Sequence, residues 1–233
     1  DLDGNTFVQD ITFNSTAATN PSTATVSLVS TDQTKDGVTQ STTVTGGKST
    51  IVELDQADTA AMARLGQAIA TRWGRLDGFV ANAGQLGQMA PLPHIDPEIF
   101  EKTMMVNLTS VWYQIAAFDT LLRASNAGRA VLVSSGAAQG ARAYWGAYAV
   151  SKAGLEAMAR AWAAESEKTD MRINLIDPGA TRTAMRAAAY PGEDPDSLRT
   201  AEDITPAFLH LLSSDCTSQG MLYKAAELSA KLG

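Results

Sequence analysis

Tyr148 and Lys152 are four residues apart in an alanine-rich segment that predicts a helix. That spacing places a phenol and an ammonium on one helix face. A free tyrosine has a pKa of about 10, too high for a base at neutral pH. A fixed cation nearby favours the phenolate and lowers that pKa, so we expect the pair to exchange a proton with a substrate oxygen. The alternative is that both side chains merely lie on a helix surface.

Polar and turn-forming residues follow three of the segments that we interpret as strands. Ser135 ends one of them, thirteen residues before Tyr148, and its hydroxyl is suited to hydrogen-bond a carbonyl or alkoxide oxygen. Asn82-Ala83-Gly84 follows another strand, and Pro178-Gly179 follows a third. Alone, such strand-end residues are more typical of turns than of sites. Asn107 lies within an amphipathic helix, where its side chain is unfavourable unless it is bonded.

Strand and helix patterns alternate from residue 51 onward. Asp58 is a candidate cap for a helix that Gly74 stops, and Asp96-Pro97 begins a longer helix. Strands are expected at 24–30, 51–55, 76–82, 129–134, 172–177 and 220–224. This alternation predicts βαβ units, and therefore an α/β doubly wound sheet of about seven mostly parallel strands with helices on both faces. Such sheets bind ligands beyond the carboxyl ends of their strands.

Composition and charge exclude several classes of function. The 233 residues are 45% hydrophobic and 18% charged, as in an ordinary folded protein. With a formal charge of −7, we expect no nucleic-acid or membrane partner. The single cysteine, Cys216, favours a cytoplasmic location. Because His94 and His210 are the only histidines, we expect no zinc or other metal site.

Taken together, the pattern resembles the short-chain dehydrogenase/reductase family from residue 46 to about 215. The matching residues occur in the family's order and spacing: Asn82-Ala83-Gly84, Asn107, Ser135, Tyr148, Lys152, Pro178-Gly179 and Thr183. Trp145–Tyr148 and Thr181–Arg186 look like a bacterial subgroup of oxidoreductases with unassigned substrates. The resemblance implies an enzyme that transfers a hydride between NAD or NADP and a small carbonyl/alcohol substrate.

The resemblance also implies a role for each matching residue. Tyr148 would be the general acid in reduction and the base in oxidation, with Lys152 lowering its pKa and holding the nicotinamide ribose. Ser135 would orient the substrate oxygen, and Asn107 would kink its helix and hold a proton-relaying water. The other cofactor contacts would come from strand ends, namely Asp55, Asn82, Ala83 and Gly84 on the adenosine side, and Pro178, Gly179 and Thr183 at the nicotinamide.

The segment 184–200 is expected to form a lid over the substrate, with a plain surface loop as the alternative. Gln139, Trp145 and Met185 are the candidate pocket-lining residues, which would suit a partly apolar substrate. We expect residues 1–233 to form one dinucleotide-binding domain. By the same resemblance, apolar positions on the helices near Asp96 and Tyr148 predict a homodimer or homotetramer.

The chain departs from the family in its first 45 residues. The glycine-rich turn that would hold the pyrophosphate is missing, because the only glycines there are Gly4 and Gly37. One interpretation is that residues 1–45 are partly misassigned. Another is a family member that has lost dinucleotide binding and acts as a binding or scaffold protein, and a third is an epimerase or lyase on the same fold. Asp32, near the position that selects NAD or NADP, lies in this segment.

Overall fold

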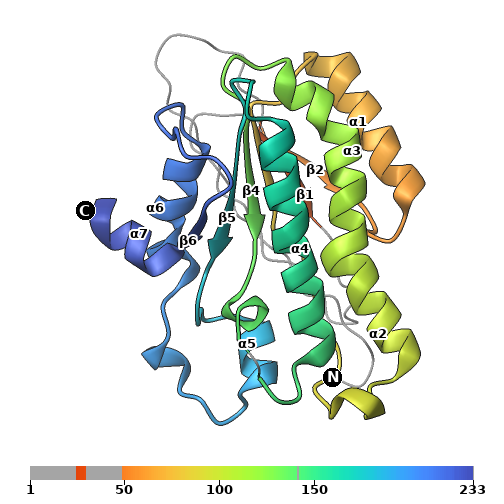
Figure 1. The fold of residues 1–233 in the computed structure, drawn as a ribbon, viewed down its shortest axis with the longest axis vertical. Coiled ribbons are helices and arrows are strands. Elements are labelled where there is room, and N and C mark those ends of the chain that lie inside the picture. The colour runs from red at the N-terminus through yellow and green to blue at the C-terminus, as the bar shows by residue number, and fades with distance from the viewer. Residues whose placement is uncertain (1–24, 30–48, 141, 233) are drawn as a thin grey trace.

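The computed structural model describes residues 25–29, 49–140 and 142–232, in which helices and strands alternate (Figure 1). Its strands are β1 (Thr25–Val29), β2 (Ser49–Glu53), β3 (Gly78–Ala81), β4 (Arg129–Val133), β5 (Arg172–Asp177) and β6 (Leu222–Lys224). Its α-helices are α1 (Thr59–Trp73), α2 (Pro97–Met104), α3 (Ser110–Arg123), α4 (Gly146–Glu165), α5 (Ala184–Ala189), α6 (Ala201–Leu212) and α7 (Ala225–Leu232).

The described strands are parallel wherever they pair. One sheet has the order β3-β4-β5-β6, and β1 pairs with β2. The prediction of a parallel α/β sheet is therefore confirmed. A strand expected before β1, and the region where the glycine-rich turn would lie, fall outside the described residues. None of the helices between residues 49 and 232 combines the length and apolar character that crossing a membrane requires.

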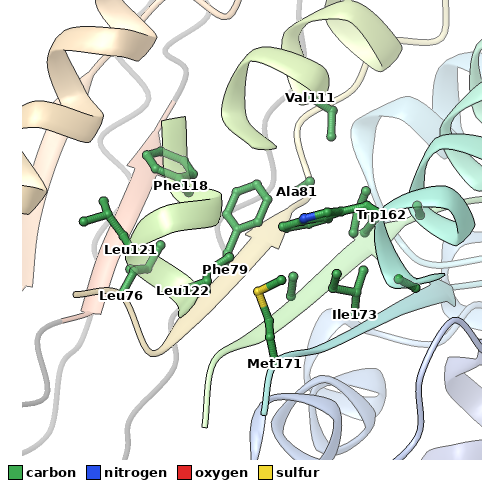
Figure 2. Packing of buried hydrophobic residues seen from close by; sticks show 14 of the residues in the cluster. Leu76, Phe79, Ala81, Val111, Phe118, Leu121, Leu122, Trp162, Met171 and Ile173 are labelled. Atoms are coloured by element: carbon green, nitrogen blue, oxygen red, sulfur yellow. The ribbon is translucent and has the colours of Figure 1, made fainter. Parts of the chain in front are cut away.

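Strand β4 shows why helices cover both faces of the sheet. Ala130 and Leu132 pack in a cluster with α1, α3 and α4, whereas Val131 and Val133 pack with α6 and α7 (Figure 1). Successive side chains of a strand point to opposite faces, so a strand buried on both faces is apolar throughout. Figure 2 shows the first cluster, in which the ring centroids of Phe79 and Phe118 are 5.3 Å apart in an edge-on contact.

Two predicted helix starts are confirmed by their caps. The Asp58 carboxylate accepts the Ala61 amide at 2.9 Å, and α1 ends at Gly74, whose φ of 74° favours glycine. Asp96 caps α2 in the same way. The long helix expected beyond Asp96 is interrupted by a π-helical segment, Met105–Thr109, which lies between α2 and α3. Such segments are often found at functional sites, and this one contains Asn107.

Candidate active site

Three of the predicted site residues meet beyond the carboxyl end of β4. Ser135 follows that strand, and Tyr148 and Lys152 lie one helical turn apart on α4. The Ser135 hydroxyl lies near enough to the Tyr148 phenol to lower its pKa, and Lys152 Nζ lies 5.9 Å from the centroid of the Tyr148 ring. The structure thus brings together a phenol, a hydroxyl and an ammonium, the groups expected to handle a proton at a substrate oxygen.

Lys152 is a buried cation. Its ammonium donates to the Val133 carbonyl at 2.8 Å, and no carboxylate among the described residues pairs with it. Burial lowers the pKa of Lys152 to about 8, because desolvation disfavours the charged form. An ammonium has three donors, so this arrangement leaves donors for a ligand hydroxyl.

Burial is the main influence on the Tyr148 phenol. Burial raises the pKa of the Tyr148 phenol, the Ser135 hydrogen bond lowers it, and the charge of Asp177 raises it. The effect of burial is the largest, so the net pKa of Tyr148 lies above its usual value, and the lowering expected from Lys152 stays a prediction. A phenol that stays protonated at neutral pH is suited to donate a proton, which is the direction that reduction of a carbonyl requires.

The Asn107 side chain is fully buried and fastens the loop after β3. Its Oδ1 accepts the Gln85 amide at 2.8 Å, and its Nδ2 donates to the Gln85 carbonyl at 2.9 Å and to Ser151 Oγ at 3.0 Å. Ser151 directly precedes Lys152, so Asn107 links the π-helical segment, this loop and the helix of the candidate acid. The proton-relaying water expected at Asn107 stays a prediction.

The segment 184–200 contacts the loop before α4 through aromatic and cationic side chains. The ring of Tyr190 lies 5.9 Å from that of Trp145, which meets the Tyr148 ring edge-on at 5.8 Å. Arg142 donates to the Tyr190 hydroxyl at 3.1 Å, and the Arg186 guanidinium lies 3.8 Å above the Tyr190 ring. A line of contacts therefore runs from the expected lid through Trp145 to Tyr148.

The other two candidate pocket residues are placed differently from Trp145. Gln139 is exposed, and its amide nitrogen is 3.2 Å from the carboxylate of Glu156. Met185 is half-buried on α5, whose first turn is capped by Thr183 accepting the Arg186 amide at 3.1 Å. A direct role for Gln139 and Met185 in lining a pocket stays a prediction.

Comparison with known proteins decides the family. A family model described as Enoyl-(Acyl carrier protein) reductase matches residues 11–214. The uncharacterised oxidoreductase YciK of Escherichia coli K12 is 42% identical over 163 residues, which are 70% of this chain and 64% of that protein. A short-chain dehydrogenase from Escherichia coli CFT073, solved in complex with NADPH, has a TM-score of 0.72 and 39% identity over 77% of this chain and 75% of that one.

This chain belongs to the short-chain dehydrogenase/reductase family. A further relative, an uncharacterised NAD-dependent oxidoreductase of Mycobacterium tuberculosis, is 37% identical over 134 residues, which are 57% of this chain and 48% of that protein. The chain thus spans less than two thirds of the length of these curated relatives. The family resemblance stated from the motifs is confirmed.

Most of the residues expected to contact a cofactor lie shortly after the strands in this chain. Gly84 follows β3 so closely packed that a Cβ there would lie 3.3 Å from Asn107 Oδ1 and 3.5 Å from Lys152 Nζ. Gly179 follows β5 with a φ of 71°, a backbone conformation that favours glycine. Asn82 and Ala83, Pro178 and Thr183 flank these two glycines, and the exposed Asp55 follows β2. Their contacts with a cofactor stay predictions.

Sequence reasoning missed several residues of this family site. Ser151 lies between Tyr148 and Lys152 in the motif, and Asp177 directly precedes Pro178, so position alone could have drawn attention to both. Gln85 acts largely through its backbone, for which its side-chain type gives no signal. The contribution of Glu156, four residues after Lys152, depends on tertiary contacts.

Proposed function

We propose that this chain is an NAD(P)-dependent oxidoreductase that transfers a hydride between a nicotinamide cofactor and a carbonyl/alcohol substrate. The observation that carries the proposal is the meeting of Ser135, Tyr148 and Lys152 beyond the end of β4. Membership of the short-chain dehydrogenase/reductase family supports it. One solved relative was crystallised with NADPH, and another relative is described as NAD-dependent. The relatives therefore support a nicotinamide cofactor, and experiment must decide between NAD and NADP.

The described residues fit the nicotinamide half of such a cofactor. The buried Lys152 ammonium donates one hydrogen bond to the Val133 carbonyl. Its remaining N–H groups would be unfavourable when buried without a partner, and ribose hydroxyls are suited to accept from them. Gly179, at the expected nicotinamide position after β5, has open space where a Cβ would lie, so its backbone permits close approach. The residues expected to meet the pyrophosphate fall in the first 45 positions, outside the described ranges.

In the proposed reduction, the bound cofactor supplies the hydride, and the protein supplies a proton and electrostatic stabilisation. Tyr148, whose pKa burial raises, donates its phenolic proton to the substrate oxygen. Ser135 hydrogen-bonds the same oxygen and orients it. The Lys152 cation stabilises the phenolate that forms, because opposite charges attract strongly in a buried site.

The alternatives predict different experimental results. A scaffold or binding protein would have no reason to keep a buried lysine beside a tyrosine and a serine, since an uncompensated buried cation is unfavourable. An epimerase or lyase would act on its substrate without net change in the cofactor. We therefore favour the oxidoreductase, and we test the three together.

The test is a titration of the full chain with NADH and NADPH, followed by turnover measurements on a panel of aldehydes and ketones. Tyr148→Phe serves as the matched control, because it keeps the ring and removes the proton donor. Cofactor oxidation that depends on the carbonyl and is lost in the control supports the proposal. Cofactor binding without turnover on any member, or conversion without net cofactor oxidation, contradicts it.

We further propose that residues 1–233 act as one domain, that segment 184–200 covers the substrate, and that the chain forms a homodimer or homotetramer. Large exposed apolar side chains on α2, α3 and α4 support the oligomer, because an exposed apolar surface favours contact with a second subunit. These are Ile99, Trp112 and Val150. Light scattering on the purified protein distinguishes monomer, dimer and tetramer. The cytoplasmic location stays a prediction.

A further inference from the structure

Glu156 is a buried carboxylate that holds both ends of the loop carrying Ser135. It is only 4% exposed and lies on α4, one turn beyond Lys152. Its Oε1 accepts Ser134 Oγ at 2.6 Å and Gln139 Nε2 at 3.2 Å. These donors come from the residue before Ser135 and from the residue that ends the short 3-10 turn after it. One carboxylate oxygen of Glu156 therefore accepts hydrogen bonds from both ends of the loop 134–139.

The remaining contacts of loop 134–139 show how the two Glu156 hydrogen bonds affect Ser135. The Ser134 amide donates to the Ile176 carbonyl at 2.7 Å, which ties the loop to β5. Ser135 Oγ accepts the Ala137 amide at 3.3 Å, and the same hydroxyl lowers the pKa of the Tyr148 phenol. The direction of the Ser135 hydroxyl thus depends on the path of the 134–139 backbone, which the Glu156 contacts fix from the α4 side.

The charge of Glu156 is balanced locally. Arg160, one turn further along α4, donates to Glu156 Oε2 at 2.8 Å and is itself half exposed. Burial raises the pKa of Glu156, but the hydrogen bonds from Ser134, Arg160 and Gln139 outweigh it, so the net pKa lies below the usual value. A carboxylate kept ionised is a stronger acceptor than a neutral group.

We infer that Glu156 is a positioning residue of the proposed reaction, which holds loop 134–139 so that Ser135 faces Tyr148. The inference rests on the proposed function, and the hydrogen bonds of Glu156 join it to Ser134, Gln139 and Arg160 rather than to Tyr148. Its effect passes through Ser135. Removing the carboxylate should therefore change the placement of the Ser135 hydroxyl relative to Tyr148 and the orientation of the substrate oxygen, while leaving the cofactor residues in place.

The first experiment is a double-mutant cycle between Glu156 and Ser135. We expect Glu156→Ala to lower kcat about tenfold, with the KM of the cofactor changed less than about twofold. In the Ser135→Ala background, Glu156→Ala should have no further effect on kcat. Glu156→Gln, which keeps an acceptor for Ser134, should restore most of the activity. An equal loss of kcat in both backgrounds, or no loss in either, would overturn the inference.

The second experiment needs no turnover. In protein labelled at the tyrosine ring carbon that bears the hydroxyl, NMR reports the hydrogen bond and titration of Tyr148, assigned with Tyr148→Phe. We expect Glu156→Ala to shift the Tyr148 signal and raise its titration midpoint, as Ser135→Ala does, because the Ser135 bond lowers that pKa. An unmoved signal contradicts the inference, whereas failure of the proposed function appears as a wild-type protein without turnover.

Asp119 supplies the matched control. It is a partly buried carboxylate on α3 that accepts Trp162 Nε1 and Arg123 Nε, both at 2.7 Å. Asp119→Asn should lower the free energy of unfolding and leave both the Tyr148 signal and kcat unchanged. If Glu156→Ala fails to fold, Ser134→Ala removes a single Glu156 contact and should give the same changes in smaller measure. A silent Ser134→Ala in that case counts against the inference.

Discussion

The two sides of the proposed site are held by different kinds of interaction. On the β3–α4 side, Asn107 and Ser151 are fully buried and Lys152 is 3% exposed, with short hydrogen bonds among them and the backbone. On the side of the proposed lid, segment 184–200, Arg186 Nη2 donates to Glu193 Oε1 at 2.6 Å, and both side chains remain partly exposed. Buried polar groups are unfavourable when they are left unpaired, whereas an ion pair that solvent reaches is screened and contributes less. The first side is thus expected to be rigid, and the second free to rearrange around a substrate.

The largest effect is expected from Tyr148→Phe. The change removes the proton donor but keeps the ring against Trp145, so turnover should fall by about a hundred- to ten-thousandfold. Stability should change by no more than about 1 kcal/mol. Steady-state kinetics and thermal unfolding measure the two quantities. Activity within tenfold of the wild type would remove Tyr148 from its assigned role.

Asn107→Ala should come next, because it leaves both backbone groups of Gln85 and the Ser151 hydroxyl without their partner. We expect the free energy of unfolding in urea to fall by about 3 kcal/mol and kcat to fall as well. Asn174→Ala is the control, since the Asn174 amide also bonds two backbone groups, those of Ser218 and Met221. Asn174→Ala should lower the free energy of unfolding and leave kcat unchanged. Equal losses of kcat in the two variants would contradict the difference expected between Asn107 and Asn174.

The buried side of the site also predicts a pH dependence, because it contains Lys152. Its pKa falls from 10.5 to about 8 on folding, so its cation stabilises a phenolate below pH 8 and is lost as pH rises through that value. Reduction should therefore slow above about pH 8. Between pH 8 and 10.5 the unfolded state binds the extra proton, so the lysine's contribution to unfolding free energy rises with pH. Lys152→Met should lack that rise, and a wild-type stability curve identical to that of the variant would refute it.

The smallest effect is expected on the lid side. Tyr190→Phe removes the hydroxyl that Arg142 bonds and keeps the ring beside Trp145. Stability should change by less than about 0.5 kcal/mol, and the KM of the best carbonyl substrate should rise about two- to fivefold with kcat little changed. Tyr144→Phe, an exposed tyrosine in the loop before α4, should be silent. A stability loss as large as that of Asn107→Ala would end the distinction between the two sides.

The sequence predicted those features that depend on short stretches of chain. Alternating apolar patterns placed the parallel strands, and the caps at Asp58 and Asp96 placed two helices. The spacing from Ser135 to Tyr148 and Lys152 located the candidate site, because strand ends and one helical turn bring these residues together.

Features that depend on tertiary packing could not be predicted in this way. The raised pKa of Tyr148 follows from burial among distant elements and from Asp177. Gln139 also contacts Glu156, which lies on another element, and its position in the sequence does not indicate that contact. The contact of Tyr190 with Trp145 joins segments that are far apart in the chain. Local periodicity carries no information on such pairings.

The central claim is that this chain transfers a hydride to a carbonyl carbon. The most direct measurement supplies NADPH or NADH deuterated at the transferring carbon, incubates the wild type with the carbonyl panel, and examines the alcohol products by mass spectrometry. We expect deuterium on the carbinol carbon of at least one product, and none with Tyr148→Phe. Protein that binds the cofactor yet yields no deuterated alcohol from any member of the panel would contradict the account.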